Sequence, residues 1–350
     1  MFGTYRTLLA LLVVFQHIGG VFVIGAYAVF GFYILSGYLM TTIMHNSYGY
    51  SPKGMGRYFT NRFLRIYPVY WFSCAFTLCL IYWMGENYTR QYHNAIFFPH
   101  DLSSLFNNLL LFFPLRDVPR LTPPSWALTV ELVFYIFIGL GASVSRFTTT
   151  AWFAVSVLYH IGINAFALDW DYRYFIVPAA SLPFSTGAMI FHYKNEILRV
   201  LNFLEDPLTP VLLVCLIPVN FFLGFLLRFL TGVEFVLGPS FYCNYVLQSL
   251  VIVSLCQRRS LPSIGKKLDK FLGDFSYPVY LIHYQVGLLV LIGLNYIGLE
   301  LRRPHPILAL ASLPVIFLIS WILIVFMDRP INSVRNRVKS NAGIDESTSG

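Results

Sequence analysis

The stretch TLLALLVVFQHIGGVFVIGAYAVFGFYILSGYLMTTIMHNSYGYSP, residues 7–52, contains no Asp, Glu, Lys or Arg in 46 positions. As a single α-helix it would be about 69 Å long. That is more than twice the roughly 30 Å thickness of the hydrocarbon core of a bilayer. The stretch therefore predicts two membrane-spanning helices joined by a tight turn, and Gly19, Gly20 and Gly25 mark where the turn lies.

The rest of the chain repeats this apolar character. Of its 350 residues, 57% are hydrophobic and 11% are charged, whereas soluble domains are about 25% charged. Ten spans are predicted from the charge-poor runs, at residues 7–24, 27–45, 66–85, 126–143, 150–167, 174–192, 209–227, 235–256, 276–298 and 306–327. The apolar segment 104–115 is too short to cross a bilayer, so we expect a half-helix or an interfacial piece.

This pattern predicts an all-α polytopic membrane protein with about ten transmembrane helices. Residues 1–330 are expected to form one membrane-embedded domain, and residues 331–350 a short polar cytoplasmic tail that is disordered. With both termini in the cytoplasm, 17 of the 24 Lys and Arg residues fall on the cytoplasmic side. The positive-inside rule expects this bias.

The same bias accounts for the net charge of +8 without a nucleic-acid partner, because most of the basic residues serve to orient the spans. The five cysteines lie in or near apolar spans and show no C-x-x-C spacing. We therefore expect no metal site. Ser36-Gly37 lacks the G-x-S-x-G context of a serine nucleophile, so these small residues are expected to serve close helix packing.

Titratable residues within the predicted spans are the first functional candidates, since ionisable groups in a bilayer are costly. His17 follows Arg6 by eleven residues, about 16 Å along a helix, which places it near the middle of the membrane. An imidazole there suits a general base, although a histidine that hydrogen-bonds between helices for packing would show the same spacing. His283 is consistent with a binding role near the cytoplasmic side or with a structural role.

Glu131 lies five residues after Trp126, about 8 Å below the outer surface of the membrane. A carboxylate at that depth needs an arginine, a histidine or a water-filled cavity beside it. We expect it either to orient His17 and stabilise an imidazolium, as the carboxylate of a hydrolase triad does, or to form a structural pair with an arginine.

Arg62 and Arg65 are three positions apart, so they share one face of a helix. Two guanidinium groups at the membrane surface suit phosphate recognition. Arginines that only orient the span and extend toward the headgroups would give the same pattern.

Six motifs occur together along the chain: YRTLLALLVVFQH (5–17), VFGFYILSGYLM (29–40), YFTNRFLRIYPVYW (58–71), SWALTVELVFYIF (125–137), FSYPVYLIHYQV (275–286) and FMDRPI (326–331). In this order, and on a ten-span scaffold, the set resembles the acyltransferase type 3 family of integral membrane proteins. Two positions depart from the family's pattern. Asn61 stands where the first arginine of a common Arg-Arg pair would be, and Asp328 stands where many relatives have Glu.

The resemblance implies a multi-pass enzyme of the inner (plasma) membrane that moves an acyl group, usually acetyl, onto a carbohydrate hydroxyl. The expected donor is acetyl-CoA, and the expected acceptor is a surface glycan or a lipid-linked sugar: O-antigen, exopolysaccharide or lipo-oligosaccharide. Membrane lipid is the remaining partner. His17 would be the catalytic histidine, and Glu131 would take the place of the family's acidic residue after Ser-Trp. Arg6, Arg62 and Arg65 would be functional arginines on the donor side.

On this hypothesis the two arginines of the 58–71 motif hold the CoA phosphates, and the thioester reaches His17 through a cavity open to both faces. His17 either deprotonates the sugar hydroxyl or accepts the acyl group transiently. The alternative to an enzyme is a proton-coupled transporter of a lipid or a glycan, because buried His and Glu residues also suit a proton relay.

Overall fold

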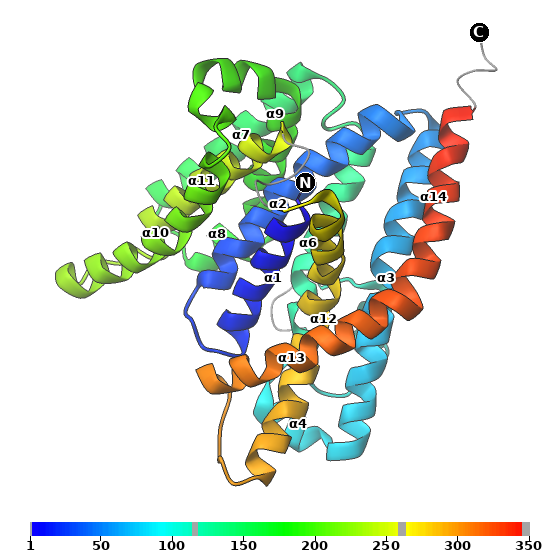
Figure 1. The fold of residues 1–350 in the computed structure, drawn as a ribbon, viewed down its shortest axis with the longest axis vertical. Coiled ribbons are helices and arrows are strands. Elements are labelled where there is room, and N and C mark those ends of the chain that lie inside the picture. Colours follow the sequence, from blue (N-terminus) through cyan, green and yellow to red (C-terminus); the bar gives the residue numbers. More distant parts are fainter. Residues whose placement is uncertain (1, 114–117, 258–263, 345–350) are drawn as a thin grey trace. The chain divides into compact units, whose positions relative to one another are not determined.

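The computed structural model of the chain describes residues 2–113, 118–257 and 264–344, and within these ranges it contains helices and no strand (Figure 1). The chain divides into two compact units. The first comprises Met1–Leu9, Val23–Asn46 and Phe134–Gly273. The second comprises Ala10–Phe22, Ser47–Val133 and Asp274–Gly350.

Among the described residues, the first unit contains six whole α-helices: α2 (Ile24–Ile43), α7 (Arg146–Ala165), α8 (Trp170–Tyr174), α9 (Val177–Val200), α10 (Thr209–Thr231) and α11 (Pro239–Cys256). The second contains five: α3 (Pro52–Met84), α4 (Glu86–Tyr92), α5 (Leu102–Leu110), α13 (Pro306–Leu323) and α14 (Arg329–Ile344). Three further helices begin in one unit and end in the other: α1 (Gly3–His17), α6 (Trp126–Gly139) and α12 (Lys266–Tyr296).

Close packing of α2 against α9 forms the centre of the first unit. A Cβ atom on Gly37 would lie 2.1 Å from the carbonyl oxygen of Phe184, and one on Gly187 would lie 2.0 Å from the carbonyl oxygen of Ile34. The two backbones therefore approach more closely than any side chain allows, as small residues permit between membrane helices. The expectation of close packing at Ser36-Gly37 is confirmed.

Within the second unit, helix starts follow ordinary capping chemistry. Ser51 accepts a hydrogen bond from the backbone nitrogen of Gly54 at 3.1 Å, and Pro52 occupies the first turn of α3, where its missing N–H costs nothing. The predicted turn between the first two spans is also present, since α1 ends at His17 and α2 begins at Ile24. Gly20 lies between them with φ of 80°, a conformation that glycine adopts at little cost.

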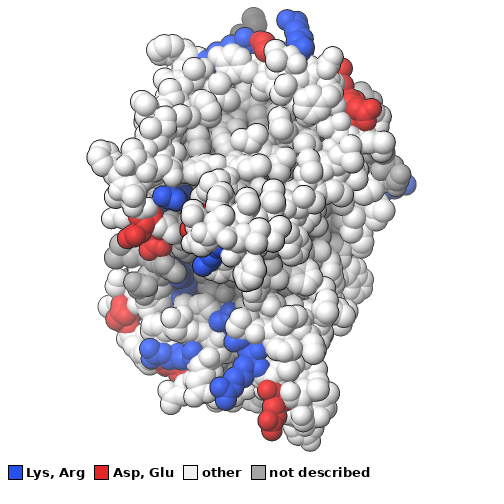
Figure 2. Space-filling view, turned by 90° about the vertical axis from the view of Figure 1, so that its left-hand side faces the viewer, with Lys and Arg blue, Asp and Glu red and all other residues white. Residues whose placement is uncertain are grey.

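Seven helical segments in the described part of the chain are long and apolar enough to cross a membrane: Ile24–Tyr48, Pro52–Met84, Trp170–Val200, Thr209–Thr231, Pro239–Cys256, Lys266–Tyr296 and Pro306–Lys339. Every predicted span coincides with a helix. Three of those helices, α1, α6 and α7, are not among the seven, and α1 and α6 have only 15 and 14 residues. The structure thus supports seven spans, and the count of ten and the side of each terminus stay predictions. The face shown in Figure 2 carries few charged side chains, with wide uncharged areas between them.

The tail differs from its prediction. Residues 331–344, expected to be disordered, are helical in α14, and residues 345–350 lie outside the described part of the chain. The helix packs against α3, where the Asn61 side-chain amide donates to the carbonyl oxygen of Arg335 at 3.1 Å. The polar composition of this segment predicted disorder, because composition carries no information about the tertiary contact with α3.

Candidate active site

His17 is the last residue of α1, and its position is set by hydrogen bonds at that helix end. The Arg303 guanidinium donates from Nη1 to the carbonyl oxygen of His17 at 2.8 Å and from Nε to that of Tyr92 at 2.8 Å. The backbone nitrogen of His305 donates to the carbonyl oxygen of Ile18 at 2.7 Å. A cation at a helix C-terminus is favourable because it satisfies carbonyls that have no helical partner. The 303–305 segment therefore holds the end of α1 in place.

The ring of His17 pairs with His283 of α12. His17 Nδ1 lies 2.9 Å from His283 Nε2, and the planes of the two rings are nearly parallel, at 10° to each other. On its other side, His283 Nδ1 lies 2.8 Å from the carbonyl oxygen of Tyr280 and 3.3 Å from that of Val279.

These contacts fix the tautomer of both rings when both are neutral. A carbonyl oxygen only accepts hydrogen bonds, so Nδ1 of His283 must carry the proton and its Nε2 must accept. His17 then donates from Nδ1, which leaves the lone pair of its Nε2 unprotonated. His17 is only partly buried, and its Nε2 has no hydrogen-bond partner in the part of the chain that the structure describes. One ring nitrogen of the pair is therefore able to act as a base.

Aromatic rings and cations surround this histidine pair. The Tyr284 ring lies 5.0 Å from that of His17 and 4.8 Å from that of His283, and the Arg303 guanidinium lies 5.1 Å from the Tyr284 ring. His93, which follows α4, meets Tyr284 edge-on at 4.9 Å. Burial, together with the positive charges of Arg303 and Arg120, lowers the pKa of His93 to about 3. His93 is therefore neutral at neutral pH, and the cations nearby are arginines.

Glu131 lies in α6 within the same unit. Its negative charge acts on the hydroxyl groups of Tyr58 and Tyr280, and Tyr280 donates to the carbonyl oxygen of Pro124 at 2.8 Å. The ring of His17 is hydrogen-bonded to His283 instead. Tyr280 precedes His283 by about one turn of α12.

Arg62 and Arg65 lie together at a cluster of guanidinium groups where α3 meets α14. Arg62 donates from Nη2 to Asn61 Oδ1 at 2.7 Å, and the same oxygen accepts from Nη2 of Arg335 at 3.2 Å. Arg65 lies 3.5 Å from the carboxylate of Asp328. One amide oxygen thus holds two cations side by side, next to the pair of Arg65 and Asp328. The arrangement suits an external anion with several negative charges, such as a phosphate.

Arg6 lies on the portion of α1 that belongs to the first unit, eleven residues before His17 in the same helix.

Three residues of these clusters were not predicted from the sequence: Arg303, His93 and Arg335. In the sequence each is only a basic or titratable residue in a predicted loop or tail. Many other residues of the chain fit that description, so it does not identify a site. In the described ranges, no group of three or more His, Cys, Asp or Glu residues could hold a metal ion.

Comparison with known proteins gives one match. A family model described as an acyltransferase domain matches residues 4–325, nearly the whole chain. No curated protein and no solved structure matches the chain. The matched range contains His17, Glu131, both arginines of the 58–71 motif and His283, but it ends before Arg335.

Proposed function

The chain belongs to the acyltransferase type 3 family, and on that premise we propose that it transfers an acetyl group from acetyl-CoA to a hydroxyl group of a glycan at the inner membrane. The acceptor in this proposal is a cell-surface glycan or its lipid-linked precursor. The observation that supports it most is the His17–His283 pair, which leaves one unprotonated imidazole nitrogen with no partner in the described residues. Family membership also favours transfer over proton-coupled transport.

In the direct route, Nε2 of His17 removes the proton from the sugar hydroxyl while that oxygen attacks the thioester carbonyl carbon. The C–S bond breaks, and the His17 imidazolium returns the proton to the CoA thiolate. The Nδ1–H of His17 stays bonded to His283 throughout, and this bond strengthens while His17 is charged.

In the covalent route, Nε2 of His17 attacks the thioester carbonyl carbon first, the C–S bond breaks, and CoA leaves as a thiolate that takes up a proton from water. The sugar hydroxyl then attacks the carbonyl carbon of the acetyl-imidazolium, the N–C bond breaks and its electron pair returns to Nε2, and the hydroxyl proton passes to water, which restores neutral His17. Acetylation of His17 after addition of acetyl-CoA alone would distinguish this route from the direct one.

Negative charge develops on the thioester oxygen in either route, and preorganised cations stabilise it. Arg303 is hydrogen-bonded to the His17 carbonyl oxygen, and Arg120 is a buried arginine whose charge acts on His93 and Tyr284. We assign this stabilising role to these two guanidiniums. For Glu131 we propose an indirect role, in which its charge acts on Tyr280 and so on the helix that carries His283.

The donor-side site in this proposal is the cluster of Arg62, Arg65 and Arg335. CoA carries phosphate groups, and guanidiniums bind phosphates through paired hydrogen bonds. Arg62 and Arg335 are already oriented by Asn61, so little side-chain entropy is lost on binding. Arg6 is included on the donor side because its place in the first motif implies it.

The test uses the purified chain in lipid nanodiscs with acetyl-CoA and a purified surface glycan. Release of free CoA in equal amounts to O-acetyl ester on the glycan, measured by mass spectrometry, is the expected result. Glycan movement across a vesicle membrane without CoA release would instead show a transporter. CoA release without any acetylated glycan would show that the acceptor is of another class.

A further inference from the structure

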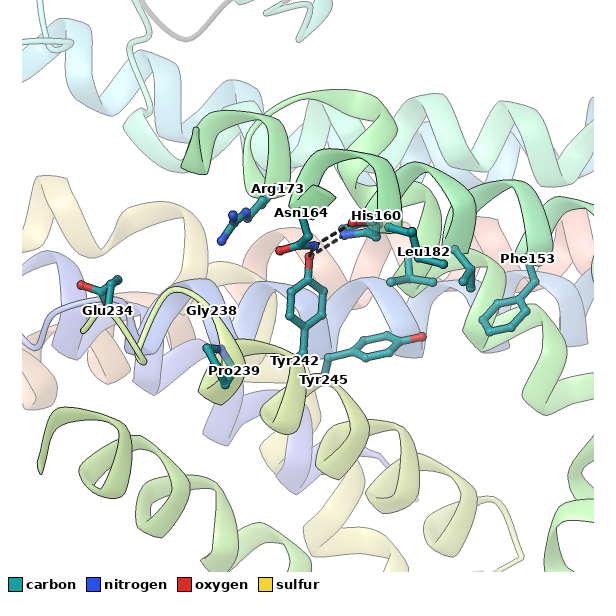
Figure 3. Close-up of a pocket in the computed structure, with 12 residues that line it drawn as sticks. Phe153, His160, Asn164, Arg173, Leu182, Glu234, Gly238, Pro239, Tyr242 and Tyr245 are labelled. Carbon is teal, nitrogen blue, oxygen red and sulfur yellow. Dashed lines mark hydrogen bonds between the residues drawn. The ribbon is translucent and has the colours of Figure 1, made fainter. Parts of the chain in front are cut away.

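The first unit contains a cavity that the proposed reaction does not use. Its volume is about 720 Å³, and it is lined by α7, α8, α9, α11 and the loop before α11 (Figure 3). Small-molecule sites typically have about 300–1,000 Å³, so this cavity is large enough for a ligand.

One face of α7 forms a wall of the cavity. The residues that line it are Phe153, Val157, His160, Ile161 and Asn164. Their spacing of four, three, one and three positions keeps them on a single side of a helix. Together they extend about 16 Å along the axis of α7, which gives the cavity an elongated wall.

The polar groups of the cavity gather where its helices end. Asn164 is one residue before the end of α7, Arg173 lies in α8 and Pro239 is the first residue of α11. Asn164 donates from Nδ2 to the hydroxyl oxygen of Tyr242 at 2.7 Å, and His160 Nδ1 lies 3.1 Å from that oxygen. Figure 3 shows these side chains pointing toward one another beside Arg173.

The opposite end of the cavity is apolar and lies deeper along the same helices. Phe153 is twelve residues before the end of α7, Leu182 is five residues into α9 and Tyr245 is six residues into α11. The Tyr245 hydroxyl is hydrogen-bonded to the hydroxyl of Thr186. The cavity is therefore polar near the helix ends and apolar near the helix interiors. A bilayer is likewise polar at its surface and apolar in its core.

Arg173 supplies a positive charge at the polar end. Its Nε atom is buried and has no hydrogen-bond partner among the described residues. Glu234 also lines the cavity, but its carboxylate already accepts from Arg228 at 2.8 Å and from the backbone nitrogen of Val236 at 2.9 Å. The lining therefore has one guanidinium able to receive an anion from outside.

We propose that this cavity binds one anionic phospholipid, with its phosphate at Arg173 and one acyl chain along the α7 face toward Phe153. Segments Trp170–Val200 and Pro239–Cys256, which contribute to the lining, are long and apolar enough to cross a membrane, so bilayer lipid is the neighbouring material. A soluble anion would leave the apolar wall unused, and an uncharged lipid would leave Arg173 unused. The proposal does not depend on the acetyl-transfer reaction.

The experiment is native mass spectrometry of the purified full chain titrated with phosphatidylglycerol or phosphatidylcholine. One phosphatidylglycerol should bind more tightly than phosphatidylcholine. Arg173→Gln should weaken phosphatidylglycerol binding about tenfold or more, because a hydrogen bond to a charged group is lost, whereas Arg173→Lys should retain part of it. Val157→Trp should reduce binding of both lipids by filling the cavity.

The matched control is Arg199→Gln, an exposed arginine near the other end of α9, which should bind as the wild type does. Equal affinity for the two lipids, an unchanged Arg173→Gln variant, or full binding by Val157→Trp would each overturn the proposal. So would displacement of the lipid by inorganic phosphate alone, or stronger retention of a polyprenyl phosphate than of phosphatidylglycerol. Monodisperse elution of each variant establishes that it folds.

Discussion

Replacing His283 with phenylalanine removes the acceptor for the Nδ1–H of His17 but keeps an aromatic ring at this position. In the wild type this acceptor lies 2.9 Å from His17 Nδ1, and the ring centroids are 5.2 Å apart. His283 is fully buried, so water does not readily replace the missing nitrogen. The variant therefore tests whether His283 positions His17 for catalysis or only packs against it.

The expected effect follows from the change of charge on His17 during the reaction. A hydrogen bond between neutral groups contributes about 0.5–1.5 kcal/mol, and one to a charged group about 1.5–3 kcal/mol. The bond to His283 should therefore strengthen by about 1–2 kcal/mol when His17 becomes an imidazolium. At about 1.36 kcal/mol per tenfold change in rate, kcat should fall about 5- to 30-fold, while the KM for acetyl-CoA should change little.

The assay is CoA release in nanodiscs with a saturating glycan acceptor, with the thermal unfolding temperature recorded for each variant. His283→Gln is the matched variant, because its amide oxygen can accept from Nδ1 of His17, and it should recover part of the lost kcat. Wild-type kcat in a folded His283→Phe variant would refute the positioning role. Equal losses in both variants would show that the ring of His283 matters for packing alone.

Three further predictions concern the cluster of Arg62, Arg65 and Arg335, the contact between α2 and α9, and the half-buried His93 outside the spans. Arg335→Gln should raise the KM for acetyl-CoA about tenfold with a smaller change in kcat, because a phosphate contact is lost, whereas the exposed Lys339→Gln should leave both unchanged. Gly187→Ala should lower the unfolding free energy by about 1–3 kcal/mol through overpacking, while Gly162→Ala, which faces open space, should not; detergent unfolding curves would compare them. Because the pKa of His93 is lowered from 6.5 to about 3, the unfolded chain binds that proton more readily, and stability should decrease as the pH falls below about 6.5. His93→Gln should flatten this decrease in unfolding measured between pH 7 and 4, and an unchanged slope would contradict the assignment.

The positions of the helices could be predicted from charge-free runs, since each predicted span coincides with a helix. The number of these helices that cross the membrane could not be predicted in this way. The run around Glu131 looked long enough to cross, but α6 ends at Gly139 after 14 residues. Hydropathy reports where apolar residues lie, whereas helix ends depend on local backbone contacts that leave little trace in composition.

The candidate site, too, could be predicted from the sequence only in part. His17 could be identified because a titratable group in an apolar span is unusual. The sequence suggested Glu131 as the residue that orients His17. The hydrogen bond from His17 to His283 could not be predicted, because the two residues lie on different helices and only tertiary packing brings them together. His283 pairs with His17 across 266 positions of sequence. Arg335 could not be predicted as a site residue for a related reason. It shares the Asn61 side-chain oxygen with Arg62 only because α14 packs against α3.

In the proposed reaction, Nε2 of His17 is the reactive atom. The most direct measurement is the rate of glycan acetylation by His17→Ala in nanodiscs, beside the wild-type chain and with folding checked by its unfolding temperature. Removal of a general base costs about 10²- to 10⁴-fold in rate, so kcat should fall by at least about 100-fold. A folded His17→Ala variant that acetylates the glycan at the wild-type rate would contradict the account.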